Sequence, residues 1–337
     1  MLTSIGRWLG SWVRSDPDAE TQSGDEDTQS DITAADETLG NPYQPSIADV
    51  LVVKSMLTKG LQLPLELVES IVDQAEYWPH TTTEVNYAAR DDNGLHTVGF
   101  SETADNSENE LLLRSVPLGF HTWPAKSPSK GRWDLYRTSV PPNPSGEQYP
   151  ADSFQSLMNY PTPLVTHPCR KIVFTIRSRD QGWGGSRGDH YTYRGSWTWF
   201  EAGLERWTKK PGDNSLEAED QPSFVLEDLS TVHPQVVPEN ENTHKFNHPL
   251  LAVEDLKIQC NKTAMREILE HRVEWSYTDD EISESKLADI GRGKETGDGK
   301  FVRELQLGDI VTVWGKNRFP GWANYVESVK IEVYWVV

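Results

Sequence analysis

Between Asp180 and Gly203 the chain reads DQGWGGSRGDHYTYRGSWTWFEAG, which brings three tryptophans, paired glycines and several charges close together. Glycines let a loop adopt left-handed backbone conformations, and a tryptophan inside such a loop, here Trp183, is difficult to bury completely. Proteins hold sugars and peptides with aromatic rings that stack and with planar polar groups that fix orientation. The stretch therefore predicts a ligand-binding surface.

A second aromatic turn, RFPGW at residues 318–322, has Pro320 and Gly321 at its corner and could lie beside the first loop. The open alternative is structural: Trp197 and Trp199 pack in the core, and the second turn only closes the end of the fold. The candidate ligand-binding residues are Asp180, Gln181, Trp183, Arg194, Trp322 and Asn324.

Motifs that would indicate an enzyme are absent from the sequence, which contains no G-x-S-x-G, H-E-x-x-H or C-x-x-C. We expect no catalytic residue, cofactor or metal. One enzymatic alternative stays open, in which Asp180 and Glu201 form a glycosidase carboxylate pair; it requires a separation of roughly 5–10 Å in an open cleft. The glycine-rich residues 291–301 lack phosphate-loop spacing, and we expect a flexible hairpin loop there with no helix after it.

The composition limits the kinds of partner and the cellular compartment that we expect for this chain. The 337 residues carry a formal net charge of −20, which argues against nucleic-acid binding because that needs Lys and Arg to displace phosphate counterions. Two cysteines, Cys169 and Cys260, are too few for a disulfide framework and predict a reduced cytoplasmic or nuclear protein. No apolar run approaches the ~20 residues that span a bilayer.

The N-terminal part divides into three segments. Residues 1–14 have the spacing of a short amphipathic helix, which could lie on a membrane surface, in a partner's groove or on its own domain. Residues 15–42 hold nine acidic residues and no aromatic one, and we expect them to be disordered. Residues 43–80 are predicted to be helical, most clearly at 61–78, and the expected partner-binding side chains are Leu65, Val68 and Ile71.

From residue 81 to the C-terminus, short runs of alternating polar and apolar residues are separated by Pro, Gly and Asn. Alternation with turn-rich spacers is typical of antiparallel sheets with one buried face. We predict a mainly β fold, an antiparallel sandwich over 81–337 with long loops at 124–168 and 205–222. The expected strands are 110–116, 170–178, 191–202, 223–229, 271–279, 309–317 and 328–337.

Two resemblances add to this interpretation. LQLPLELVESIVDQAEYW (residues 61–78) resembles the opening of an F-box, which implies binding to the adaptor of a cullin-type ubiquitin ligase. Residues 58–337 resemble a family of uncharacterised fungal proteins through IRSRDQGWGG, GSWTWFEAGLE and RFPGWANYVESVKIEVYWVV. The strand order also looks similar to galactose-binding-like jelly rolls, an analogy of fold and not of ligand.

These observations predict a non-catalytic interaction protein whose sandwich binds a protein or glycan through its end loops. With the F-box resemblance, it would be a substrate-recognition subunit of a ubiquitin ligase. The alternatives are a carbohydrate-processing enzyme and a peripheral membrane protein anchored by residues 1–14.

Overall fold

The computed structural model describes residues 43–89, 94–99, 108–120, 165–207, 229–238, 244–248 and 256–337. Residues Gln44–Val337 form one compact unit. The segments expected at 1–14 and 15–42 lie outside the described residues, as do most of the two loops expected at 124–168 and 205–222 and most of the strand expected at 223–229. None of the helices in the described part of the chain is long and apolar enough to cross a membrane.

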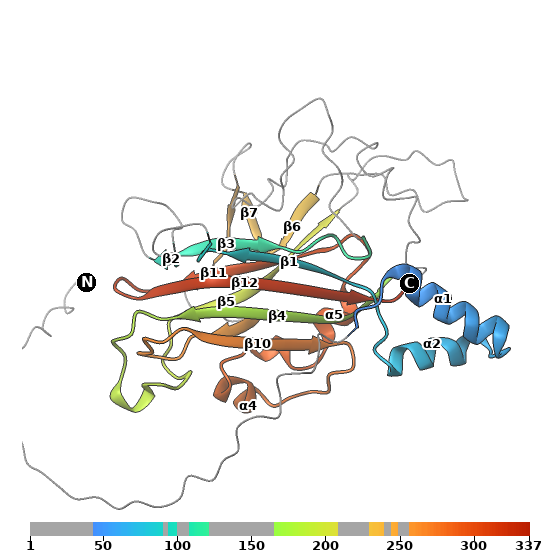
Figure 1. Cartoon of the computed structure of the whole chain (residues 1–337). Helices are drawn as coiled ribbons and strands as arrows, with labels where there is room; N and C mark the ends of the chain where they lie inside the picture. The colour runs from blue at the N-terminus through green and yellow to red at the C-terminus, as the bar shows by residue number, and fades with distance from the viewer. Residues whose placement is uncertain are drawn as a thin grey trace, which may run out of the picture. The chain divides into compact units, whose positions relative to one another are not determined.

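The first antiparallel sheet is built around the C-terminal strand (Figure 1). In β12, Val329, Ile331 and Val333 alternate with polar residues, and all three are buried, as the sequence pattern predicts. Ile331 pairs with Phe174 of the neighbouring strand. The strand order is β1 (His80–Asn86), β12 (Ala323–Trp335), β4 (Cys169–Arg179) and β10 (Leu269–Ser276), with β2 (His96–Gly99) also paired to β12.

The second sheet is also antiparallel and places β11 and β5 at its centre, where Val313 pairs with Ala202. Its order is β3 (Asn109–Arg114), β11 (Ile310–Asn317), β5 (Thr198–Trp207) and β6 (Leu229–His233), with β9 (Lys257–Cys260) also paired to β5. A small two-stranded sheet joins β7 (Val236–Pro238) to β8 (His244–Phe246).

Both sheets contribute to one hydrophobic core. Ile172, Phe174 and Ile176 come from the first sheet, and Phe200 and Val313 come from the second. Each of these side chains is fully buried, and burial of a large apolar side chain contributes about 1.5–3 kcal/mol to stability. The prediction of a mainly β protein with antiparallel sheets is therefore confirmed.

Three helical segments precede the sheets: α1 (Ile47–Ser55), the π-helical turn η1 (Met56–Gly60) and α2 (Leu65–Gln74). Ser46 and Asp49 form a capping box that begins α1. Pro64 precedes the first turn of α2, where its missing N–H costs no helical hydrogen bond. The prediction of helices in residues 43–80 is confirmed, but these helices belong to the same compact unit as the sheets.

Two local predictions are wrong. Residues 191–197 were expected to begin a strand, but they form turns, and β5 starts only at Thr198. Residues 291–301 contain η4 (Lys294–Thr296) and the start of α5 (Lys300–Glu304), and they pack on β9 through Gly291 O, which accepts from Cys260 N at 2.8 Å. The other short helices are η3 (Arg187–Asp189) and α4 (Glu284–Asp289).

Candidate functional site

The loop that follows β4 is held in place by Asp180. Its side chain is fully buried and accepts hydrogen bonds from the backbone N–H of Gly182 at 2.7 Å and of Ala264 at 2.6 Å. Burial raises the pKa of the Asp180 carboxyl, and the backbone donors oppose that rise. Asp180 was expected to contact a ligand, but with both oxygens engaged beneath the surface it joins two loops instead.

Two glycines let these loops approach each other closely. A Cβ on Gly182 would lie 2.6 Å from Cγ of Arg266, and a Cβ on Gly185 would lie 2.7 Å from Cγ2 of Thr263. Both glycines have φ values, +81° and +71°, that other residues rarely adopt. The glycines of this loop therefore serve both its backbone conformation and its packing on residues 262–266.

Trp183 projects from the loop and is 60% exposed. Gln181 fixes the backbone of this loop. Its amide nitrogen donates to Trp183 O, and its amide oxygen accepts from Ala323 N at 3.2 Å. A Cβ on Gly321 would lie 3.5 Å from the Trp183 ring, and the half-buried Trp322 lies beside Gly184 and Gly185. The expectation that the second aromatic turn lies beside the first loop is confirmed.

Thr263, which sequence reasoning missed, joins residues 262–266 to residues 191–194. Its Oγ1 donates to Arg194 O at 2.7 Å, and its carbonyl accepts from Tyr191 N at 2.8 Å. Tyr191 is 62% exposed and has a left-handed backbone (φ +63°), which is costly outside glycine. Residues 180–197, 262–266 and 318–322 thus form one continuous region, which we call the end-loop surface.

The last two predicted ligand-binding residues differ in exposure. The Arg194 side chain is 71% exposed and pairs with Asp289 on α4 at 3.2 Å. Asn324 is fully buried, where its amide oxygen accepts from Asn261 Nδ2 at 2.9 Å and its amide nitrogen donates to Trp199 O at 3.2 Å. Asn324 therefore braces the loops from within, and Trp183, Arg194 and Trp322 remain as exposed or half-buried candidates.

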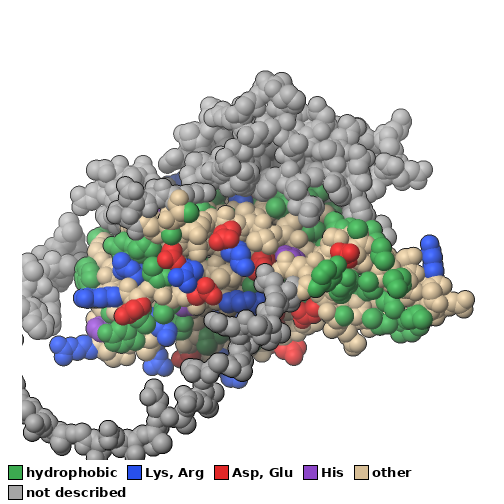
Figure 2. All heavy atoms as spheres, in the orientation of Figure 1, with side chains coloured by type: hydrophobic (Ala, Val, Ile, Leu, Met, Phe, Trp, Pro, Cys, Tyr) green, Lys and Arg blue, Asp and Glu red, His purple; other side chains and the backbone are tan. Residues whose placement is uncertain are grey.

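A second exposed surface lies on the helices. Of the three expected partner-binding side chains, Leu65 and Ile71 point outward, at 58% and 42% exposed, whereas Val68 is fully buried. Val68 was therefore misplaced, because the same helix turns one side of its apolar stripe inward. Figure 2 shows hydrophobic side chains gathered over the helical segments. The remaining exposed apolar side chains of this helical surface are Leu51, Val52, Met56, Leu61 and Leu67.

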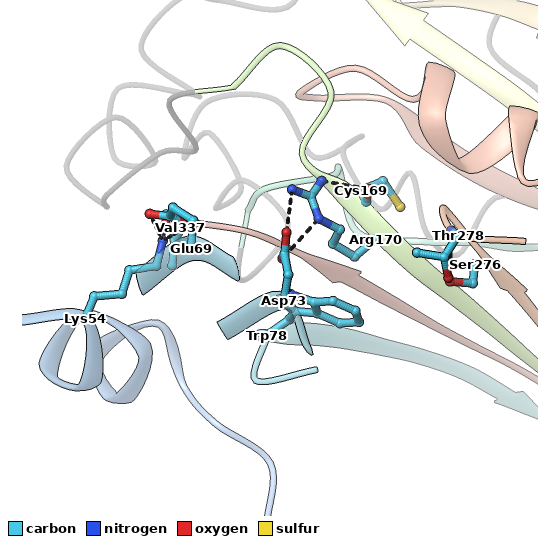
Figure 3. Close-up of polar contacts among 9 residues, drawn as sticks. All are labelled: Lys54, Glu69, Asp73, Trp78, Cys169, Arg170, Ser276, Thr278 and Val337. Atoms are coloured by element: carbon cyan, nitrogen blue, oxygen red, sulfur yellow. Dashed lines mark hydrogen bonds and ion pairs between the residues drawn. The ribbon is translucent and has the colours of Figure 1, made fainter. Parts of the chain in front are cut away.

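Polar contacts fix the helices to the sheets (Figure 3). Asp73 of α2 accepts from Nε of Arg170 at 3.2 Å and from Nε1 of Trp78 at 2.8 Å. Lys54 of α1 pairs with Glu69 of α2 at 2.7 Å and also donates to the carbonyl of Val337. The helical surface is consequently presented in a defined orientation.

A buried lysine occupies the face of the second sheet opposite the core. Lys316 is 1% exposed, and its Nζ lies 2.5 Å from Nδ1 of His248 and 4.0 Å from Glu201. Burial is the largest cause that lowers the pKa of Lys316 to about 7. Trp199, which the structural alternative placed in the core, lies on this face under the guanidinium of Arg318, at 4.6 Å.

The enzymatic alternative finds no support in this geometry. Asp180 is buried beneath the end-loop surface, and Glu201 lies within β5 beside Lys316. The two carboxylates therefore do not present the open pair that glycoside hydrolysis needs. Comparison of the chain with protein-family models, with curated proteins and with solved structures yields no match.

Proposed function

We propose that this chain is a non-catalytic interaction protein. In this proposal its two sheets stack as a jelly-roll-like sandwich, the helical surface docks on a protein partner, and the end-loop surface holds a protein or glycan ligand. The partner that fits the helical surface best is the adaptor of a cullin-type ubiquitin ligase, so the chain would select substrates for ubiquitylation.

The single observation that carries the proposal is the helical surface. Seven large apolar side chains between residues 51 and 71 are each 39–66% exposed. A contiguous apolar patch on a folded protein is typical of a protein–protein interface. Leu65 and Leu67 belong to the L-P-x-E-L sequence that resembles an F-box opening, which supports an adaptor as the partner.

The test is a pull-down of purified ligase adaptor with the full-length protein. We expect the double variant Leu65→Ser, Ile71→Ser to recover adaptor at least about tenfold less well than wild type, because it removes two exposed apolar side chains of α2. Ile290→Ser, which changes another exposed apolar side chain (46% exposed), is the matched control and should bind normally. Failure of the wild-type protein to recover any adaptor would contradict the proposal.

A further inference from the structure

We propose that the end-loop surface binds an acidic polypeptide segment. This inference rests on the proposed function only in taking the end-loop surface as a ligand-binding site, and it names the chemical class of that ligand. It stands on the charge of the surface, on its exposed aromatic rings and on the rigidity of the loops beneath them.

The charge of the surface is opposite to that of the whole chain. Residues 180–197, 262–266 and 318–322, with Arg179 immediately before them, carry six Lys and Arg but only two Asp, whereas the chain has a net charge of −20. Asp180 is buried and engaged with backbone donors, and Arg318 is buried as well, which leaves five cations and Asp189 exposed or half-buried. Lys and Arg side chains gather at this end of the view in Figure 2, where Figure 1 draws the connection from β4 to β5.

Four of these cations lack a carboxylate partner. Arg179, Arg187, Lys262 and Arg266 make no ion pair with any residue that the structure describes, whereas exposed Arg194 pairs with Asp289. Arg187 and Arg266 are exposed, and Lys262 lies 5.6 Å above the Tyr193 ring. Clusters of unpaired basic side chains are the common means of recognising acidic motifs in proteins.

Aromatic rings accompany the cations. Trp183 and Tyr191 are the two most exposed aromatic side chains of this surface, at 60% and 62%, and Trp322 lies beside the glycines of the Trp183 loop. Large rigid rings offer contact area at a small cost in side-chain entropy. Rings among cations suit a peptide, whose backbone and apolar atoms can pack on Trp183 while its carboxylates meet the arginines.

Hydrogen bonds already fix the loops of this surface in the absence of a ligand. Asp180 and Thr263 join residues 180–197 to residues 262–266, and Gln181 accepts from Ala323 N beside residues 318–322. Ser178, Asn261 and Asn324 form a buried hydrogen-bonded chain. A ligand that binds loops already held in this way loses less free energy to ordering them. The buried polar residues therefore support binding without touching the ligand.

Other ligand classes fit less well. A neutral glycan would stack on Trp183 but would leave four unpaired cations unused. A long nucleic acid would meet these cations at one end only, while the remainder of a chain with net charge −20 would repel it. A short acidic polypeptide can contact both the rings and the cations without reaching the acidic remainder of the chain.

The experiment measures binding of a fluorescently labelled peptide that alternates glutamate with glycine, and that contains one tyrosine, to the full-length protein. The comparison ligands are the same peptide with glutamine in place of glutamate, and a neutral chito-oligosaccharide. We expect the acidic peptide to bind at least about tenfold more tightly than the glutamine peptide, and we expect this preference to shrink in about 0.5 M NaCl, where charges are strongly screened.

Variants assign the binding to the surface. Trp183→Ala should weaken binding of the acidic peptide by about tenfold, because it removes an exposed ring. The double change Arg187→Gln, Lys262→Gln should weaken it by roughly three- to tenfold, because charge pairs near the surface each contribute little. Lys300→Gln on α5 removes a charge from an exposed lysine (side chain 58% exposed) elsewhere and should leave the affinity unchanged. Thermal unfolding of each variant shows whether its fold is retained.

Three results would overturn the inference: equal affinity for the glutamine peptide, preferential binding of the oligosaccharide, or wild-type affinity in both loop variants. Loss of adaptor binding is a separate result, because the adaptor is expected on the helical surface. The loop variants should recover adaptor as well as wild type, so failure of either proposal can be recognised without the other.

Discussion

At the scale of single residues, Asp180 shows how a buried carboxylate can hold two loops together. Its two oxygens join segments that lie 84 residues apart in the chain. Asp180→Asn would place an amide NH₂ against one of the two backbone donors. We expect the free energy of unfolding to fall by roughly 1–3 kcal/mol, measured from urea denaturation, because one buried N–H loses its acceptor.

The control for this prediction is Asp289→Asn, whose side chain is 64% exposed and forms a surface ion pair with Arg194. Surface ion pairs contribute little, so we expect its unfolding free energy to change by less than about 1 kcal/mol. Equal destabilisation by the two changes would show that Asp180 does not brace the loops.

The buried Lys316 should make the unfolding free energy depend on pH. Burial, the largest cause, lowers its pKa from 10.5 in the unfolded chain to about 7 in the folded protein, while Glu201 opposes the change. Between these two values the unfolded chain binds more protons than the folded one, so stability should rise with pH. We expect the unfolding free energy of wild type, relative to Lys316→Met, to increase by on the order of a few kcal/mol from pH 7 to pH 10.

The comparison with Lys316→Met is needed because tyrosines and other lysines also titrate at high pH. Denaturant unfolding at several pH values measures both proteins under identical conditions. A constant difference between them across this range would mean that Lys316 keeps an ordinary pKa in the folded protein.

At the scale of elements, helix α2 has an inward and an outward apolar face. Val68 is fully buried and Leu67 is 53% exposed, although both are apolar and adjacent in sequence. We expect Val68→Ala to lower the unfolding free energy by roughly 1–3 kcal/mol, because it removes buried methyl groups and leaves a cavity. Leu67→Ala should change it by less than about 0.5 kcal/mol.

Adaptor binding should show the opposite order for this pair: Leu67→Ala should weaken it, and Val68→Ala should affect it only as far as the fold is lost. Urea denaturation and the pull-down therefore separate the two faces. Similar effects of both substitutions on stability would contradict the inward and outward faces described here.

At the scale of the whole molecule, the helices and the sheets behave as one unit. Val50, Val72, Trp78 and Val336 form a hydrophobic cluster that joins α1 and α2 to the end of the chain. Removal of residues 44–78 would uncover Val336 and its neighbours. We expect residues 79–337 alone to unfold roughly 5–10 °C below residues 44–337, measured by calorimetry. An unchanged unfolding temperature would indicate an independent helical domain.

The regular elements could be predicted because their signals are local. In β12 every second residue from Val329 to Trp335 is apolar, and a strand that buries one face needs that pattern. In α2 the spacing of Leu65, Val68, Ile71 and Val72 identified a helix. What this spacing could not identify was the neighbour of each apolar residue, so Val68 was placed on the outward face with Leu65 and Ile71.

The loops were harder to predict because their partners are distant in sequence. Tyr191 and Tyr193 alternate like strand residues, yet they lie in turns: Thr192 N donates to Asp189 O within the segment, and Tyr191 N donates to the distant Thr263 O. Residues 291–301 have the glycine content of a mobile loop, yet Gly291 packs between Gln259 and Tyr193. In both places a contact far along the chain overrides the local preference.

The sequence alone was sufficient to establish a mainly antiparallel β protein with a preceding helical segment and an aromatic loop at residues 180–185, because periodicity and glycine content depend only on near neighbours. The tertiary structure decided which side chains of that region are exposed and which are enclosed. Asp180 and Asn324 are enclosed and Trp183 is exposed because segments distant in sequence fold together around them. Burial is a property of the assembled chain, so it appears only when those distant segments meet.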